Sequence, residues 1–145
     1  MIEDRNSNDA LIVEYKEKKE NFKNAVDSRL QKLAKNFTDK EWCKNNLSKL
    51  LYIIPYCKEN KRWDDIVSLQ FYLDDFLDRE NYFIEYEQLL KIAKFSAEEK
   101  GDIRTLARLC NCLCVLLQRQ KRYEEAYEVN QLEIQLKKEL SDGEF

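Results

Sequence analysis

Four consecutive twenty-residue blocks decide the fold of this chain. In order they read WDDIVSLQFYLDDFLDRENY (63–82), FIEYEQLLKIAKFSAEEKGD (83–102), IRTLARLCNCLCVLLQRQKR (103–122) and YEEAYEVNQLEIQLKKELSD (123–142). Each block opens on a large apolar residue, and a polar stretch precedes it. Inside the blocks, apolar residues recur at steps of three and four, the spacing of one face of an α-helix. The pattern predicts four amphipathic helices of similar length, joined by short turns.

Local signals mark some of the expected helix ends. Asp102 is suited to cap the helix that begins at Ile103, and Gly101 is suited to close the helix before it. Upstream of the blocks, Asp39 is expected to cap another helix. Pro55 should kink or restart that helix, because proline removes a backbone donor and disfavours helical geometry in the residue before it.

The first part of the chain is rich in lysine and glutamate and carries one apolar stripe, from Leu11 to Phe37. We expect one long helix there, with a break near Asn21 as the alternative. Together with the four blocks and the helix capped by Asp39, this makes six helices.

The domain organisation follows from these elements. Residues 1–8 are polar and are predicted to be disordered. Residues 9–145 are predicted to form a single helical-repeat domain, with leading helices in 9–60, one repeat in 61–102 and a second repeat in 103–142.

Composition supports an all-α fold. The 145 residues include only two glycines and one proline, whereas the turns of a β protein usually recruit both residue types. Helices of one length joined by short turns pair as α–α hairpins, and hairpins at a constant period stack into a solenoid. A compact six-helix bundle is the alternative, and the regular spacing argues against it.

The last two blocks resemble a tetratricopeptide repeat. Arg122-Tyr123-Glu124-Glu125-Ala126 is similar to the start of the second helix of that motif, and Cys114 takes the small position of the first helix. Matching positions of the preceding repeat are Leu73, Leu77, Phe83, Leu90 and Ala93. The forty-residue spacing exceeds the 34 residues of the standard repeat. It is similar to the extended repeats of bacterial signalling proteins, including arrays that follow the ATPase module of some signal-transduction NTPases.

Four positions depart from that motif. In the first repeat, Asp74 and Tyr86 stand where small residues are expected. In the second, Asn130 and Glu133 replace an aromatic and a small residue. The resemblance therefore covers residues 63–142 best.

No constellation of catalytic residues is recognisable. The chain has no histidine, and its two glycines form neither a P-loop nor a dinucleotide-binding fingerprint. Cys110 and Cys114 share a helix face while Cys112 lies opposite, so a metal site is not expected. The paired carboxylates fall on polar helix faces. We predict a non-enzymatic protein without cofactor or metal.

The net charge and the distribution of charged and apolar residues indicate which class of partner to expect. The net charge of −3 is small, and the N-terminal lysines alternate with acids, so nucleic acid is not expected. No segment is apolar enough for a membrane span, and the N-terminus lacks the features of a secretion signal. We therefore expect a cytoplasmic protein whose partner is another protein or a peptide.

An acidic stretch suggests where a partner binds. Residues 64–87 hold eight acids and a single base, a local net charge of −7. In tetratricopeptide arrays the first helix of each repeat lines a concave groove. By this resemblance, the groove residues here are Phe71, Tyr72, Asp75, Asp78, Arg108, Asn111, Val115 and Gln118. We expect them to bind a basic, amphipathic peptide or helix. The alternative is that Phe71 and Tyr72 pack against a neighbouring helix and the acids only solvate the surface.

The last helix suggests a second function. Ile134 and Leu140 lie away from the Ala126 stripe, and no following helix in this sequence would cover them. A homodimer through this helix, or a role as a regulatory segment of a larger signalling protein, is the alternative to peptide binding.

Overall fold

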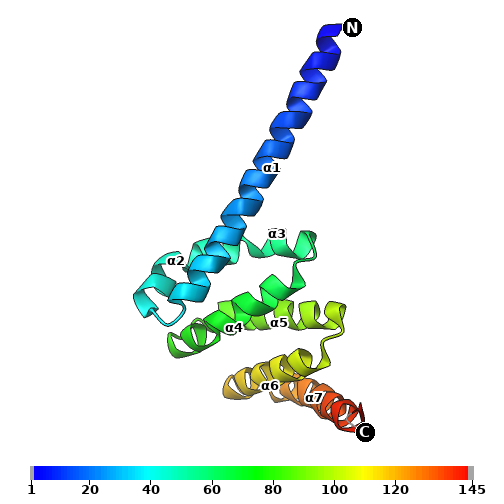
Figure 1. Cartoon of the computed structure of the whole chain (residues 1–145). Coiled ribbons are helices and arrows are strands. Elements are labelled where there is room, and N and C mark those ends of the chain that lie inside the picture. The colour runs from blue at the N-terminus through cyan, green and yellow to red at the C-terminus, as the bar shows by residue number, and fades with distance from the viewer. Residues whose placement is uncertain (1, 144–145) are drawn as a thin grey trace.

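The computed structural model describes the backbone of residues 2–143 and the side chains of residues 7–142. All regular structure in this part of the chain is helical, as predicted. The helices are α1 (Ile2–Asn36), α2 (Lys40–Tyr52), α3 (Ile54–Glu59), α4 (Trp63–Arg79), α5 (Phe83–Lys100), α6 (Ile103–Arg119) and α7 (Tyr123–Gly143). Figure 1 shows α1 projecting from a stack formed by the other helices.

Seven helices are described where six were expected, and Pro55 is the reason. The helix capped by Asp39 ends at Tyr52, and the chain restarts as the short helix α3 with Pro55 in its first turn. Asp39 caps α2 as predicted, because its carboxylate accepts a hydrogen bond from the backbone N–H of Trp42 at 3.1 Å.

Helix α1 is continuous, and the break near Asn21 does not occur. The described backbone of α1 begins at Ile2, inside the stretch 1–8 for which disorder is predicted, and Met1 lies outside the described residues. Once a helix is nucleated, each added residue gains one hydrogen bond, so a polar sequence can continue it. Val26 and Leu33, near the other end of α1, are buried in the core.

The turns before α4, α5, α6 and α7 share one backbone conformation. Lys61, Asn81, Gly101 and Lys121, spaced by twenty residues, all have positive φ between 54° and 68°. The residue after each donates its N–H to a carbonyl five residues back, at 2.8–3.0 Å. This is the Schellman arrangement, which satisfies carbonyls at a helix C-terminus. Gly101 closes α5 and Asp102 caps α6, both as predicted.

Helices α4 to α7 pack in sequence order, α4 against α5, α5 against α6 and α6 against α7. The pattern of buried and exposed positions along α4 recurs in α5 after twenty residues. Leu73 and Leu77 of α4 are fully buried, as are Ala93 and Ala97 of α5. The helical period seen in the sequence therefore becomes a period of packing, with one apolar stripe per helix.

Candidate interaction surface

The predicted groove residues of α4 line a cavity. Phe71, Tyr72 and Asp75 bound a space of about 610 Å³ together with the turn between α1 and α2, which contributes Phe37 and Thr38. The Tyr72 ring lies 4.9 Å from that of Phe37 and 5.7 Å from that of Phe71, measured between ring centroids. Tyr72 is half-buried by these contacts, whereas Phe71 remains 59% exposed. Tyr72 thus packs against the turn between α1 and α2, and Phe71 faces solvent.

Arg108 joins this aromatic group to α6. Its guanidinium carbon lies 5.7 Å from the centre of the Phe71 ring, within the range of a cation–π contact. Its Nη1 also donates to the side-chain oxygen of Gln70 at 3.2 Å. Gln70 is completely buried. The sequence places residues 70 and 71 in one helix and residue 108 in another, and the fold brings the three together.

Two departures from the repeat motif compensate for each other. Tyr86 of α5 donates its hydroxyl hydrogen to Asp74 of α4 at 2.7 Å, and Gln70 donates to the same carboxylate oxygen at 2.6 Å. A carboxylate and a phenol therefore occupy the crossing where the motif has small side chains. Burial raises the pKa of Tyr86, and the adjacent Asp74 carboxylate raises it further, so the phenol remains protonated and donates.

The middle of the surface lies where α4 faces α6. Asp78, Asn111 and Val115 line a small cavity of about 150 Å³ together with Arg119 and Tyr86. Asp78 forms an ion pair with Arg119, so it links the two helices. Val115 is 39% exposed, and Gln118, three residues further along α6, is also exposed.

A third cavity lies between α6 and α7. Its volume is about 470 Å³, and Arg104, Arg108, Asn111, Lys137 and Leu140 are among the lining residues. This end of the surface is basic. Together the three cavities include seven of the eight predicted groove residues, all except Gln118.

Glu133 is a buried carboxylate that sequence reasoning recognised only as a departure from the motif. The residue is 4% exposed. Asn111 donates to its two oxygens at 3.3 and 3.4 Å, and Lys137 pairs with it at 2.8 Å. These partners offset the cost of burying a charge. Glu133 and Lys137 are one helical turn apart, so their spacing could have predicted the ion pair between them. The contact of Glu133 with Asn111 of α6 could not be predicted from spacing along α7.

The acidic stretch carries much less free charge than its composition suggests. Most of its carboxylates form ion pairs with bases, several of which lie in other helices. The pairs are Asp64–Lys100, Asp65–Arg62, Asp75–Arg79, Asp78–Arg119, Glu80–Lys40 and Glu87 with both Lys91 and Arg122. The local charge of −7 therefore serves in large part to hold the helices together.

The cysteines behave as small apolar side chains. Cys43, Cys57, Cys110 and Cys114 are buried, and Cys112 is half-buried. Burial raises the pKa of each of these thiols, to about 11 for Cys57. Within residues 7–142, no cluster of three or more histidine, cysteine or acidic side chains is arranged to hold a metal ion. The described helices also include none long and apolar enough to cross a membrane.

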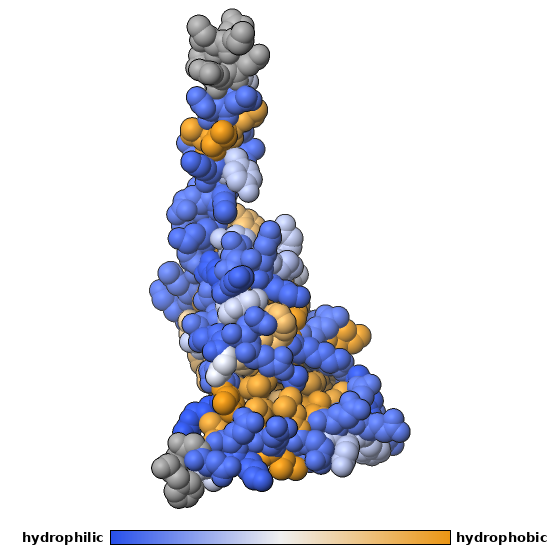
Figure 2. All heavy atoms as spheres, turned by 90° about the vertical axis from the view of Figure 1, so that its right-hand side faces the viewer, coloured by the Kyte–Doolittle hydropathy of each residue, from blue (hydrophilic) through white to orange (hydrophobic). Residues whose placement is uncertain are grey.

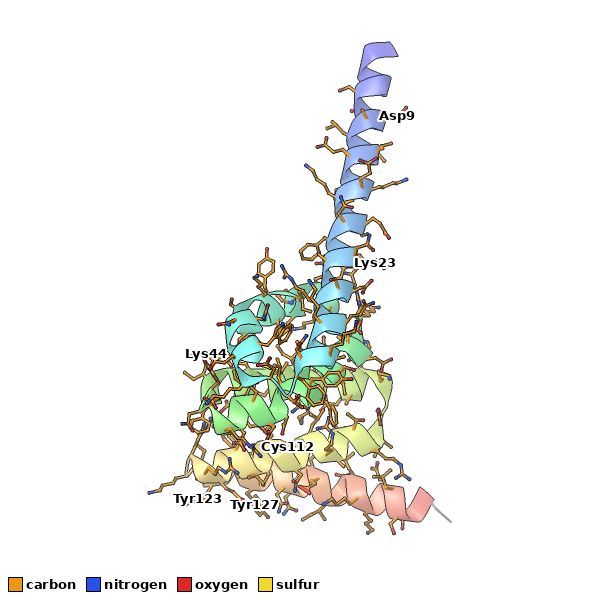
Figure 3. The ribbon with its side chains drawn as sticks, turned by 60° about the vertical axis from the view of Figure 1, so that its left-hand side comes forward. Asp9, Lys23, Lys44, Cys112, Tyr123 and Tyr127 are labelled. Carbon is orange, nitrogen blue, oxygen red and sulfur yellow. The ribbon has the colours of Figure 1, made fainter. Side chains whose placement is uncertain are left out.

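The two residues predicted for self-association lie in different environments. Ile134 is 54% exposed, and Tyr123 and Tyr127 on the same helix are each 63% exposed. Figure 3 shows both tyrosines on the outermost helix of the stack. Leu140 instead packs against the core and lines the α6–α7 cavity. The expectation that Leu140 lies away from the Ala126 stripe is wrong, because positions 126, 133, 136 and 140 follow one another at helical spacing on the inner face.

Comparisons with protein-family models, curated proteins and solved structures found no match to this chain.

Proposed function

We propose that this chain is a non-catalytic, tetratricopeptide-like interaction module of the cytoplasm that binds a partner helix or peptide. The observation that carries the proposal is Phe71, which is 59% exposed beside the cavity that it forms with Tyr72 and Phe37. Large exposed aromatic side chains at the edge of a cavity are typical anchors of protein interfaces. The partner segment is expected to carry one large apolar residue flanked by lysine or arginine.

The cavity suits an apolar anchor. Its volume of about 610 Å³ falls within the usual range of ligand pockets, and four aromatic side chains line it: Phe37, Phe71, Tyr72 and Phe76. An apolar side chain inserted there would cover Phe71 and gain the free energy of burying both surfaces.

The charge preference rests on Asp75. Its side chain is 73% exposed and pairs with Arg79, itself 76% exposed, one turn along α4. Exposed pairs of this kind add little to stability, so exchanging Arg79 for a base of the partner costs little. Lys40 and Arg79 also line the cavity, and they would disfavour a partner segment with several positive charges close to the anchor.

The non-catalytic assignment is supported by the state of the reactive groups. The carboxylates near the surface are mostly engaged in ion pairs, and the raised pKa of the cysteines keeps their thiols protonated at neutral pH. Carboxylates held in ion pairs are less available as bases, and a protonated thiol is a poor nucleophile.

A displayed peptide library selected on the wild-type chain tests this function. We expect enriched sequences with one aromatic or aliphatic anchor and neighbouring lysine or arginine. Phe71→Ser should weaken their binding at least tenfold, because it removes the anchor contact. Asp75→Lys should weaken it several-fold. Ile84→Ser is the matched control, since Ile84 is a 72% exposed apolar residue of α5 that is absent from the cavity lining.

Equal loss of binding in the Phe71 and Ile84 variants would contradict the proposed site. Enriched peptides with acidic flanks, held through Arg104 and Lys137, would contradict the basic partner and point to the α6–α7 cavity instead.

A second candidate function is supported by α7. Tyr123, Tyr127 and Ile134 leave apolar surface exposed on the outermost helix. Such a strip is suited to a second copy of α7, or to a further helix if this chain acts as a regulatory segment of a larger signalling protein. Loss of self-association with Ile134→Glu, measured by light scattering, would favour this function over peptide binding.

A further inference from the structure

One side of α7 is apolar and exposed where the matching side of α5 is charged and covered. The side chains of Glu87 and Lys94 on α5 are only 17% and 24% exposed, since α6 packs against α5 and Arg122, just before α7, pairs with Glu87. The positions forty residues later are Tyr127 and Ile134 of α7, which are 63% and 54% exposed. A helix at the end of a repeat stack usually carries polar residues on the side that no repeat covers. The apolar side of α7 is therefore suited to a further packing partner.

Acids border this side of α7. Residues 123–136 contain four glutamates and no base. Glu124 and Glu128 are exposed and lie one helical turn apart beside Tyr127. A second exposed tyrosine, Tyr123, precedes Tyr127 by one turn. We call these four residues and Ile134 the α7 strip, which is both aromatic and acidic.

The opposite end of the stack has an uncovered aromatic corner, where α1 leaves the other helices. Phe22 of α1 contacts Tyr52 of α2 and Tyr56 of α3 edge-on, with 6.5 and 5.0 Å between ring centroids. Tyr15 and Tyr52 are each 67% exposed. Every residue from 7 to 25 is exposed. Figure 1 shows this part of α1 standing clear of the stack, and Figure 2 shows apolar atoms on it between hydrophilic neighbours.

Lysines border the aromatic corner. A groove of about 410 Å³ lies there between α1 and α3, and its lining includes Lys18 and Lys19 with one acid, Glu59. The two lysines flank the line from Tyr15 to Phe22, because positions 15, 18, 19 and 22 share one helix face. The corner is therefore aromatic and basic, the complement of the α7 strip.

We propose that copies of the chain associate head to tail, with the α7 strip of one copy seated in the aromatic corner of the next. The tyrosines and Ile134 of the strip then cover the aromatic side chains of the corner, and its two glutamates lie close to Lys18 and Lys19. Charge favours this pairing over the two symmetric ones, because strip against strip brings acids together and corner against corner brings lysines together.

This association is open. The aromatic corner and the α7 strip lie at opposite ends of the stack in Figure 1, so a copy cannot fill its own corner. A head-to-tail contact of this kind yields rings or filaments in place of a closed dimer. It shares no residue with the α4–α6 surface. It also gives the exposed side of α7 an occupant other than a second α7.

The test blocks one end of the chain at a time, with sedimentation velocity of the full chain as the measurement. The wild type is expected to form species larger than a dimer as its concentration rises. Ile134→Glu blocks the strip and Tyr15→Glu blocks the corner, because each buries a charge in an apolar contact. Either variant alone should raise the dissociation constant about tenfold or more, since every contact needs an intact strip and an intact corner. An equal mixture of the two should form mixed dimers and nothing larger.

Charge reversal tests the same contact. Glu124→Lys/Glu128→Lys should weaken the association about tenfold or more, and adding Lys18→Glu/Lys19→Glu to the same chain should restore it. Lys18 pairs with Glu14 of its own helix at 3.1 Å, so circular dichroism of each variant checks that α1 stays helical. A chain with all four substitutions that stays dissociated would overturn the proposal.

The other arrangements predict different results. A monomeric wild type would overturn the proposal. Association that survives in Tyr15→Glu would show pairing of α7 with α7, and association that survives in Ile134→Glu would show pairing through α1; either result overturns it. Ile84→Ser changes an exposed apolar residue of α5 outside both surfaces and should associate as the wild type does. Phe71→Ser should also leave the association unchanged, so this test and that of peptide binding fail independently.

Discussion

At the scale of single residues, each turn before α4 to α7 holds one residue in the left-handed conformation, which disfavours a side chain with a Cβ. Three of them hold lysine or asparagine, and only Gly101 has no Cβ. A left-handed conformation costs a residue with a Cβ about 1–2 kcal/mol, and glycine avoids this cost. The turns at Lys61 and Lys121 are therefore kept by the packing of the helices around them.

We expect Lys121→Gly to raise the free energy of unfolding by about 1 kcal/mol, because it removes the steric cost at a left-handed position. Gly101→Ala should lower it by a similar amount. A Cβ at Gly101 would meet no atom within 4 Å, so the loss would be conformational and not steric crowding by neighbours. Urea denaturation followed by circular dichroism measures both. An unchanged stability in both variants would show that these turns relax when substituted.

At the scale of elements, the contact between α4 and α5 depends on a polar group as well as on apolar packing. Asp74 accepts hydrogen bonds from Tyr86 and from the buried Gln70. A small side chain at position 86 would leave that carboxylate with one fewer donor. The departures from the repeat motif at Asp74 and Tyr86 are thus linked. Either one without the other would leave a polar group short of a hydrogen-bond partner and lower the free energy of unfolding.

Tyr86→Phe is expected to lower the free energy of unfolding by about 1–2 kcal/mol, because the ring is retained while the Asp74 carboxylate loses a donor. Tyr127→Phe is the matched control, since Tyr127 is 63% exposed, and it should have no effect. Chemical denaturation of the three proteins gives the comparison. A smaller loss for Tyr86→Phe in an Asp74→Asn background, where the amide oxygen can still accept from Gln70, would show that the penalty comes from the carboxylate.

At the scale of the whole molecule, ion pairs connect helices that are distant in sequence. Arg62, before α4, pairs with Asp27 of α1, and Arg122, before α7, pairs with Glu87 of α5. Burial opposes the ionisation of Glu87, but hydrogen bonds from Arg122 and Lys91 outweigh it and hold the pKa of Glu87 below its usual value. Stability from this group is present above its unfolded pKa and is lost as pH falls through the folded pKa.

The wild type should therefore lose thermal stability as the pH falls below about 4, where carboxylates of the unfolded chain become protonated. Glu87→Gln should melt a few degrees lower at pH 7, and the two melting temperatures should converge near pH 3. Scanning calorimetry across this range measures both curves. A constant difference at every pH would show that Glu87 contributes through packing and not through charge.

The helices of the repeat region, their caps at Asp39 and Asp102, the restart at Pro55 and the turn at Gly101 could all be predicted. Each depends on residues within one or two turns of the chain, where spacing determines which groups meet. Seven of the eight predicted surface residues line the cavities described above. Their partners could not be predicted, and neither could the position of Leu140, because a pattern along one helix does not say which neighbour covers which face.

By itself, then, the sequence determined an all-helical chain with a twenty-residue period and without a recognisable catalytic constellation. Only the tertiary structure decided which bases form ion pairs with the acids of α4 and α5, because these bases lie up to 41 residues away in sequence. It also decided that residues 7–25 of α1 remain uncovered. Local hydrogen bonding and periodicity can be read along the chain, whereas charge pairing and exposure depend on distances that exist only after the helices pack.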